Sequence, residues 1–446
     1  MRSLGAGTRW IRKRESSDRK SHAHGTRIMR KKLRAYKKIL RSKEQRQKKA
    51  LEEKEAYSVD KVFRYGNFVE SARKCRKGVS WKASVQNYQL TAITKTYTDF
   101  KVIRSGKIPK CSTGREITIT ERGKARIITP IHIKDRMVQK VLCDNALVPV
   151  LSRKLIYDNG ASLQGKGVGF SRKRMEKHLR KAIRLYGPEF YILTFDIKNF
   201  FGSIPHSECR KTLERYFDKD LARIAMGIIK NPIRVKTKKI SDEKERIEKF
   251  RELEMDKAKG ICLGSQESQI MALVVPNRLD HFIKDKARMK LYVRYMDDGV
   301  IIGRTKEELK NLLVKMKQIM AQLGMSFNER KTHIVKSSKG FTFLKVKYRI
   351  SNGKIIKRLT RKGVTRMRRK LKKFRKKVNA GQMTIRNVYD SFQSWREHSK
   401  VASSYKTVRN MTKLYKDLFG ELPKKGRKHV LQNRARENYR WRYLKY

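Results

Sequence analysis

Apolar runs alternate with short polar turns in the middle of the chain, and this pattern predicts a small group of strands. Residues 191–195 are apolar and β-prone, and Asp196 ends the run. Residues 291–295 form a second such run and residues 300–302 a third. Between them lies a tight turn over residues 296–299, where Asp and Gly tolerate the required dihedral angles. We therefore expect a buried strand and a hairpin, each with a carboxylate at its end.

Helical periodicity follows the hairpin. Thr305 and Glu308 form a capping box, and Gly324 is a stop signal. The apolar residues between them share one helix face: Leu309, Leu312, Leu313, Met316, Met320 and Leu323. The spacing predicts a structural helix that backs the strands.

A second helical spacing runs through the strongly basic residues 358–377. Its apolar positions are Leu359, Val364, Met367, Leu371 and Phe374, and most of the others are Lys or Arg. This pattern predicts a helix with one apolar and one cationic face. Residues 245–259 are a further charged segment, and their pattern fits either a solvated helix or a loop.

The two ends of the chain differ from its middle. Residues 1–50 contain almost no strand formers or long apolar runs, and we expect a basic arm over residues 1–56 that is disordered or helical. Residues 423–446 form a tail rich in basic and aromatic positions. Such a tail fits stacking on single-stranded bases, and it fits equally a terminal helix docked by its aromatic side chains.

The charge balance narrows the class of partner. The chain has 446 residues and carries 114 Lys and Arg against 41 Asp and Glu, which gives a formal net charge of +73. A field of this strength attracts polyphosphate, so we expect nucleic-acid binding that is poorly sequence-selective and steeply salt-dependent. No apolar run has the length of a membrane span, and the five cysteines lack zinc-like spacing. We expect a cytoplasmic protein with reduced thiols and no membrane partner.

Three carboxylates near the predicted strand ends are the strongest candidates for chemistry. Asp297 and Asp298 lie in the hairpin turn, and Asp196 ends the upstream strand. An isolated Asp-Asp pair is most often an exposed turn. Here the upstream acidic strand end favours another interpretation, because nucleotidyl transfer requires hard oxygen ligands that hold divalent cations a few Å apart. Asp196 and Asp297 are the natural pair to bridge two ions.

Residues 191–204 (YILTFDIKNFFGSI) and the YMDD sequence at 295–298 resemble the reverse transcriptases of bacterial retroelements, and the resemblance covers about residues 97–400. It implies an α+β right-hand polymerase with a basic N-terminal arm, with fingers and palm over residues 57–350 and a helical thumb over residues 351–422. The implied activity is RNA-directed DNA synthesis with Mg²⁺, or Mn²⁺, as cofactor. The implied partners are template RNA, the RNA/cDNA duplex and deoxynucleoside triphosphates.

The same resemblance assigns roles to individual residues. Asp196 and Asp297 would bind both metal ions, and Asp298 would have a supporting acidic role in that metal site. Lys331, in the segment FNERKT, would be the general acid near the pyrophosphate. Phe201 would stack under the incoming sugar and exclude a 2′-hydroxyl, although Phe200 and Phe201 also suit the core, and we expect at least one of them to lie there.

Two flanking segments complete the implied site. In the basic segment GKARIITP, Lys124 and Arg126 would grip the nucleoside triphosphate, with the Arg126 guanidinium stacking on the base. Residues 341–345 (FTFLK) match the primer-grip strand, with Lys345 where the family usually has Gly. This departure affects the expected backbone geometry of the grip.

Residues 263–269 (LGSQESQ) indicate a subtype. Most reverse transcriptases have QGxxxSP here, whereas this chain has LGxxxSQ, with substrate contacts expected from Leu263, Gly264, Ser268 and Gln269. This is the pattern of diversity-generating retroelement enzymes, which copy a template RNA into mutagenised cDNA and act with a small, basic accessory protein of helical-bundle type. An apolar residue in place of Gln offers a physical reason for relaxed base discrimination. Gly264 also fits a simple loop before a helix.

Two other functions remain open at this point. The first keeps the chemistry but places it in a phage-defence or retron-type system. The second is an RNA-binding protein without catalysis, which the three intact carboxylates Asp196, Asp297 and Asp298 argue against, since a pure binder has no need of them.

Overall fold

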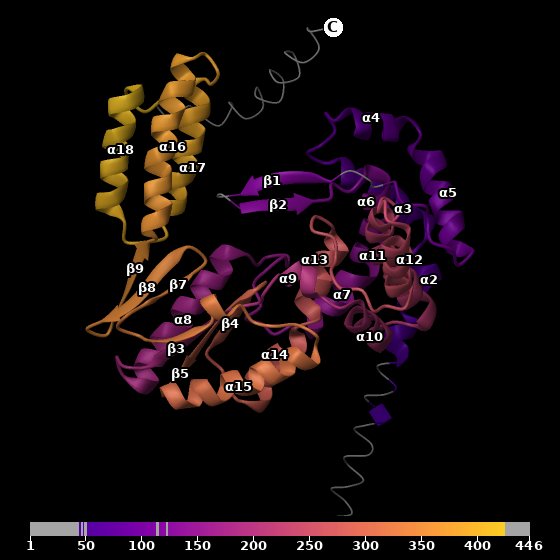
Figure 1. The fold of residues 1–446 in the computed structure, drawn as a ribbon, viewed down its shortest axis with the longest axis horizontal. Coiled ribbons are helices and arrows are strands. Elements are labelled where there is room, and N and C mark those ends of the chain that lie inside the picture. The colour runs from indigo at the N-terminus through magenta and orange to yellow at the C-terminus, as the bar shows by residue number, and fades with distance from the viewer. Residues whose placement is uncertain (1–43, 46–47, 49–50, 113–115, 122–123, 424–446) are drawn as a thin grey trace, which may run out of the picture.

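The computed structural model describes residues 44–45, 48, 51–112, 116–121 and 124–423 (Figure 1). Most of the predicted basic arm and almost all of the predicted basic aromatic tail lie outside the described residues. No helix within the described ranges is long and apolar enough to cross a membrane.

A four-stranded antiparallel sheet forms the centre of the molecule. Its strands are β3 (Tyr191–Asp196), β4 (Tyr292–Tyr295), β5 (Asp298–Gly303) and β6 (His333–Lys336), in the order β4-β5-β3-β6. The predicted strand and hairpin are therefore confirmed. Branched and aromatic residues dominate these segments, and such side chains fit a pleated surface that is buried on both sides.

Each face of this sheet belongs to a different core. Leu193 and Phe195 of β3 pack with the inner face of α15 (Lys306–Gln322). Ile192, on the opposite face of β3, packs with α8 (Val168–Tyr186) and with a second sheet. A strand points successive side chains to opposite faces, so two cores hold β3 at a defined register and height.

Helix α15 forms as its sequence predicts. The Thr305 hydroxyl accepts a hydrogen bond from the Glu308 backbone N–H at 3.2 Å, and Gly324 follows the helix with a φ of 69°. The buried positions are Leu309, Leu312, Met316 and Met320. A capped amphipathic helix thus supports one face of the sheet.

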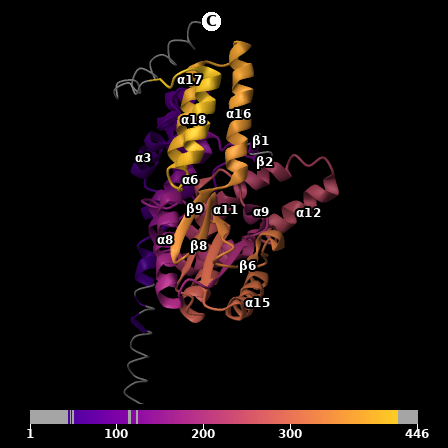
Figure 2. The same ribbon diagram turned by 90° about the vertical axis from the view of Figure 1, so that its left-hand side faces the viewer.

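Most of the remaining helices precede the β4–β5 hairpin in sequence, and most of these lie to the right of the central sheet in Figure 1; the hairpin β1–β2 lies between them and the C-terminal helices. In the N-terminal part these elements are α2 (Val59–Val62), α3 (Tyr65–Arg76), α4 (Ala83–Leu90), α5 (Ala92–Arg104), β1 (Ile117–Glu121), β2 (Lys124–Ile128), α6 (Ile133–Leu142) and α7 (Val148–Leu151). After β3 follow α9 (Phe200–Ser203), α10 (His206–Tyr216), α11 (Lys219–Thr237), α12 (Glu243–Glu254), α13 (Gln266–Val274) and α14 (Asn277–His281). Of the charged segment 245–259, left open as helix or loop, residues 245–254 belong to helix α12, which projects from the body in Figure 2, and residues 255–259 follow it as a turn and loop.

The C-terminal helices have a core of their own. Helices α16 (Arg361–Asn379), α17 (Ile385–Ser399) and α18 (Tyr405–Phe419) pack through residues such as Leu371, Phe392 and Tyr415. They stand above the sheet β7 (Phe341–Phe343), β8 (Val346–Ser351) and β9 (Lys354–Leu359), as Figure 1 shows.

Two details of this region differ from the sequence prediction. The basic helix begins at Arg361, and Leu359 belongs to strand β9, where it pairs with Val346. Residues 354–359 were expected within the helical thumb but extend a sheet instead. The alternating exposure of a β-hairpin can imitate helical spacing over a few residues, and the pairing partner β8 decided the outcome.

The turn of the β4–β5 hairpin is shorter than predicted. Tyr295 pairs with Asp298, so only Met296 and Asp297 form the turn, and Gly299 lies inside β5 opposite Phe195. A Cβ atom on Gly299 would overlap the Phe195 ring. Close packing against an aromatic ring, and not turn geometry, therefore requires glycine at this position.

We expect Gly299→Ala to lower the free energy of unfolding by about 3 kcal/mol, because the buried Phe195 ring has no room to move away from an added methyl group. Thermal unfolding of the purified variant measures this. Gly66→Ala is the matched control, since a Cβ there meets nothing within 4 Å. Gly66 lies in α3, where alanine should stabilise by about 0.5–1 kcal/mol. Equal melting temperatures for the two variants would contradict this account.

Candidate active site

The three predicted carboxylates come together at one end of the central sheet. Asp196 ends β3 and pairs directly with Asp298, the first residue of β5. Directly opposed residues of an antiparallel pair share a face of the sheet, so two like charges lie side by side. Asp297 sits in the adjacent turn, where its backbone carbonyl accepts a hydrogen bond from the Ile197 N–H at 3.1 Å.

The turn has an unusual backbone conformation. Met296 has a φ of 54°, in the left-handed region that residues with a side chain rarely adopt. The two-residue connection between β4 and β5 requires such an angle, and glycine is the usual solution. The protein therefore holds a non-glycine residue in a costly conformation directly beside Asp297.

The electrostatics of the site show an excess of negative charge. Burial, followed by the charges of Asp297 and Asp196, raises the pKa of Asp298 to about 7. Lys331 supplies a cation in direct contact with Asp196, with its Nζ 2.6 Å from Oδ2 of that carboxylate. Burial opposes charge on Lys331, but the hydrogen bond to Asp196 and the surrounding carboxylates raise its pKa overall.

The donor chemistry of this cluster suits a hard divalent cation, because all three side chains offer carboxylate oxygens. Among the described residues, no set of three or more His, Cys, Asp or Glu side chains is arranged as a ready metal shell. Asp196 instead accepts a hydrogen bond from the ammonium group of Lys331, which is a monovalent cation.

The LGxxxSQ segment lies against the hairpin β1–β2. Gly264 has a φ of 123°, and a Cβ atom there would lie 3.5 Å from the Thr129 carbonyl oxygen and 3.6 Å from Ile128. Leu263, just before it, is half-buried. The backbone thus brings this segment next to the end of β2, the strand that carries Lys124 and Arg126.

The polar residues of the segment divide into two groups. Ser265 is the N-cap of α13, and its hydroxyl bonds to the buried Ser268 at 2.7 Å. The Ser268 hydroxyl therefore accepts a hydrogen bond from the capping residue Ser265 in this conformation, whereas Gln269 is exposed. Gly264 also fits the simpler interpretation of a loop residue before a helix, because it immediately precedes the N-cap of α13.

The remaining predicted residues are placed as follows. Phe200 is 6% exposed and belongs to the core, while Phe201 is half-buried and packs on it with ring centroids 5.5 Å apart. At least one of the pair is thus core, as expected. The side chains of Lys124 and Arg126 lie outside the described part of the structure.

Lys345 stands where the family usually has Gly, and its backbone still adopts a conformation typical of glycine. Leu344 and Lys345 form the two-residue turn between β7 and β8, with φ of 46° and 72°. Both are left-handed, so Lys345 adopts the conformation for which glycine is normally used. The Arg172 guanidinium donates to the Leu344 carbonyl and helps to hold the turn.

Sequence reasoning missed the buried ionic support of the site. Arg294 and Asp280 are both fully buried and form an ion pair at 2.6 Å, and Arg294 lies two residues before Met296 of the hairpin turn. The available signal was a lone Arg inside the apolar strand YVRY, because a charge in a buried strand requires a partner. Asp280 gives no comparable signal, since it lies in a helix of mixed composition.

Comparison with known proteins agrees with this geometry. Residues 108–348 match the family described as reverse transcriptase (RNA-dependent DNA polymerase), which is more than half of the chain. The chain belongs to the reverse transcriptase family, and its α+β fold is that of a right-hand polymerase. No curated protein sequence matches it.

Solved structures include distant likenesses to two telomerases. For apo telomerase from Candida tropicalis, truncated from its C-terminal domain, the identity is 13% and the TM-score 0.35, covering 60% of this chain and 60% of that one. For telomerase from Candida albicans with a fragment of telomeric RNA, the identity is 11% and the TM-score 0.39, covering 74% and 66%. The chain thus spans less than two thirds of either telomerase, and the family match alone carries the assignment.

Proposed function

We propose that this protein is an RNA-directed DNA polymerase that makes cDNA from a template RNA, in a diversity-generating retroelement. The observation that carries the polymerase proposal is the pairing of Asp196 with Asp298 beside the strained turn of Asp297, in a chain of the reverse transcriptase family. Clustered carboxylates at a rigid sheet end have no purpose in passive RNA binding, and they are what nucleotidyl transfer requires.

In the proposed reaction the primer 3′-hydroxyl attacks the α-phosphate of a deoxynucleoside triphosphate, and pyrophosphate leaves. Divalent cations, Mg²⁺ or Mn²⁺, would activate the hydroxyl and neutralise the phosphates when bound by Asp196 and Asp297. Asp298 supports that pair from the neighbouring strand position. Lys331, whose pKa the surrounding carboxylates raise, would donate its proton to the leaving pyrophosphate.

Template RNA and the growing duplex are the proposed macromolecular partners. Helix α16 carries a large exposed cationic surface made of Arg361, Lys362, Arg366, Arg368, Arg369, Lys370, Lys372, Lys373, Arg375 and Lys376. Its apolar side is held in the helical core by Met367 and Leu371. A rigid helix with this charge suits contact with phosphate backbones of any sequence. A small basic accessory protein and a cytoplasmic location belong to the same proposal.

Primer extension tests the proposed activity. The purified protein is given a primed RNA or a primed DNA of the same sequence, with deoxynucleotides or ribonucleotides, and with Mg²⁺, Mn²⁺ or chelator. We expect extension on RNA with deoxynucleotides that requires the metal. Strong RNA binding without any extension under all these conditions would instead assign the protein to the RNA-binding class.

Leu263→Gln tests the retroelement subtype. If Leu263 faces the nascent base pair, its apolar side chain discriminates bases weakly, and the parent enzyme should misincorporate mainly opposite template adenines. Restoring a hydrogen-bonding side chain should shift discrimination by about 1–2 kcal/mol, roughly tenfold. Sequencing of cDNA that both proteins make on one defined RNA measures the spectrum. A parent error rate that is low and equal at all four template bases would favour the phage-defence or retron-type alternative.

A further inference from the structure

Arg294 makes a fan of buried hydrogen bonds that reaches the catalytic turn. Its Nη1 donates to the Met296 carbonyl at 3.0 Å, and its Nη2 donates to the Leu273 carbonyl at 2.7 Å. Met296 is the left-handed residue of the turn, and Leu273 lies near the C-terminal end of α13. One guanidinium thus joins the turn that carries Asp297 to helix α13, which begins two residues after Gly264.

Asp280 neutralises this guanidinium inside the protein. Its two carboxylate oxygens accept from Arg294 Nε at 2.8 and 3.0 Å and from Nη2 at 2.6 Å. The buried Tyr292 hydroxyl donates to the same carboxylate at 2.7 Å. Arg294, Asp280 and Tyr292 are all 0% exposed. The contacts use the charge, the planarity and the forked shape of the guanidinium. A Lys side chain would supply the charge but neither the planarity nor the fork.

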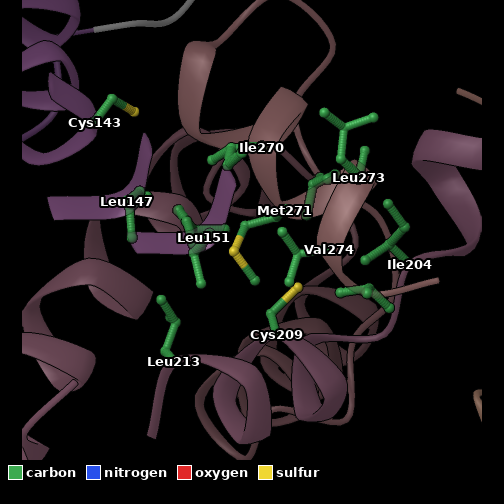
Figure 3. Packing of buried hydrophobic residues seen from close by; sticks show 14 of the residues in the cluster. Cys143, Leu147, Leu151, Ile204, Cys209, Leu213, Ile270, Met271, Leu273 and Val274 are labelled. Atoms are coloured by element: carbon green, nitrogen blue, oxygen red, sulfur yellow. The ribbon is translucent and has the colours of Figure 1, made fainter. Parts of the chain in front are cut away.

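Helix α13 is a rigid anchor for this arrangement. Ile270, Met271, Leu273 and Val274 are buried in the largest hydrophobic core, and Figure 3 shows them among side chains of neighbouring helices. Side chains in such a close-packed interior do not yield easily. A bond to the Leu273 carbonyl therefore ties the turn to a part of the protein that does not move with solvent-exposed loops.

The backbone of Arg294 is held on its other side. Its N–H donates to the Asp158 carbonyl at 3.2 Å, and its carbonyl accepts from the Gly160 N–H at 3.1 Å. The Asp158 side chain is itself bonded to His178 at 3.2 Å, Arg174 at 2.5 Å and Lys284 at 2.7 Å. Strand β4 consequently enters the turn with both its main chain and its Arg294 side chain fixed.

We propose that Arg294 is a positioning residue that holds the Met296–Asp297 turn in its strained conformation and couples that turn to α13. The effect on catalysis rests on the proposed polymerase function. The coupling between the turn and α13 does not depend on that function. Without the bond to the Met296 carbonyl, the two-residue turn is held less firmly, and the Asp297 carboxylate no longer keeps a fixed place beside Asp196. Arg294 touches neither substrate nor metal in this role.

The decisive variant removes the ion pair as a whole. Deleting only Arg294 would leave Asp280 as an unpaired buried charge and endanger folding, whereas neutralising both partners avoids this. In Arg294→Met with Asp280→Asn, the Asn carbonyl still accepts from the Tyr292 hydroxyl. Arg294→Lys is a second variant, which keeps the charge beside Asp280 but lacks a second arm for Met296. The matched control is Lys134→Met with Asp99→Asn, which neutralises a pair at 3.3 Å with Asp99 1% exposed, in helices α6 and α5.

Two measurements are made on each protein. The first is the single-nucleotide extension rate at saturating substrate, with the KM for nucleotide and the RNA affinity beside it. We expect the double variant to melt within about 5 °C of the parent and to lose about 10–100-fold in kcat, with KM and RNA affinity within about twofold. The second is hydrogen–deuterium exchange, where amides of residues 295–298 should exchange about tenfold faster or more. The control should change neither quantity.

The outcomes separate the inference from the proposed function. Parent-like kcat and parent-like exchange of residues 295–298 in the double variant would limit Arg294 to fold stability and overturn the inference. If the double variant does not fold, Arg294→Lys decides by the same two readouts. If the parent protein extends no primer, the proposed function fails, and the exchange of the turn still decides whether Arg294 holds it.

Discussion

Asp297→Asn and Asp196→Asn are each expected to reduce primer extension by about 10³-fold or more while leaving RNA affinity nearly unchanged. Asn preserves the shape of the side chain but removes the charge that holds divalent cations. We expect the RNA affinity to come from the cationic surface, which neither substitution touches. Metal-dependent extension and filter binding, measured side by side on each variant, check both parts of the expectation.

An exposed carboxylate elsewhere provides the control for this pair. Asp220 lies in α11 with its side chain 77% exposed, and Asp220→Asn removes the same charge far from the sheet end. Its extension rate should equal that of the parent. Retained extension in either Asp297→Asn or Asp196→Asn would remove the assignment of the active site, whatever the fold.

Lys331→Met is expected to lower the chemical rate by about 10²-fold or more, as the loss of a general acid typically does. The Lys331 ammonium group lies 2.6 Å from Asp196, and the neighbouring carboxylates keep it protonated. Met retains most of the side-chain length without a proton to donate. Rapid-quench measurement of single-nucleotide incorporation isolates this step from product release.

Lys336→Met is the control for the loss of a cation in the same region. Lys336 belongs to β6 and pairs with Glu189 at 2.8 Å, away from the three carboxylates. Its substitution should leave the chemical rate unchanged. If Lys331→Met and Lys336→Met had the same rate as the parent, Lys331 would serve only as a counter-ion for Asp196 when no metal is bound.

Local sequence patterns predicted the elements that depend on few neighbours. Strand β3 begins and ends as expected, because its run of apolar residues has no alternative to burial. Helix α15 begins at its predicted cap for a similarly local reason. The basic helix α16 was misplaced at its start, since Leu359 pairs with strand β8 and no local signal reveals a pairing partner.

The candidate site divides in the same way. The motif residues Asp196, Asp297 and Asp298 are visible in the sequence, and the structure brings them to one sheet end. The reason for Gly299 was misjudged, because its constraint comes from the Phe195 ring on a strand about a hundred residues upstream. In the sequence, Arg294 is visible only as a charge in an apolar strand. Its structural role depends on its contacts with Asp280 and Leu273, which the sequence does not show.

By itself, the sequence determined the family, the identity of the acidic residues and the cationic character of the chain, because short motifs and charge are local properties of the residues. Only the tertiary structure decided how the Met296–Asp297 turn is held. Residues far apart in sequence bring Asp196 beside Asp298 and bury the Arg294–Asp280 pair. Burial, desolvation and packing depend on which segments meet in space, and hydrophobic periodicity along one chain does not specify those meetings.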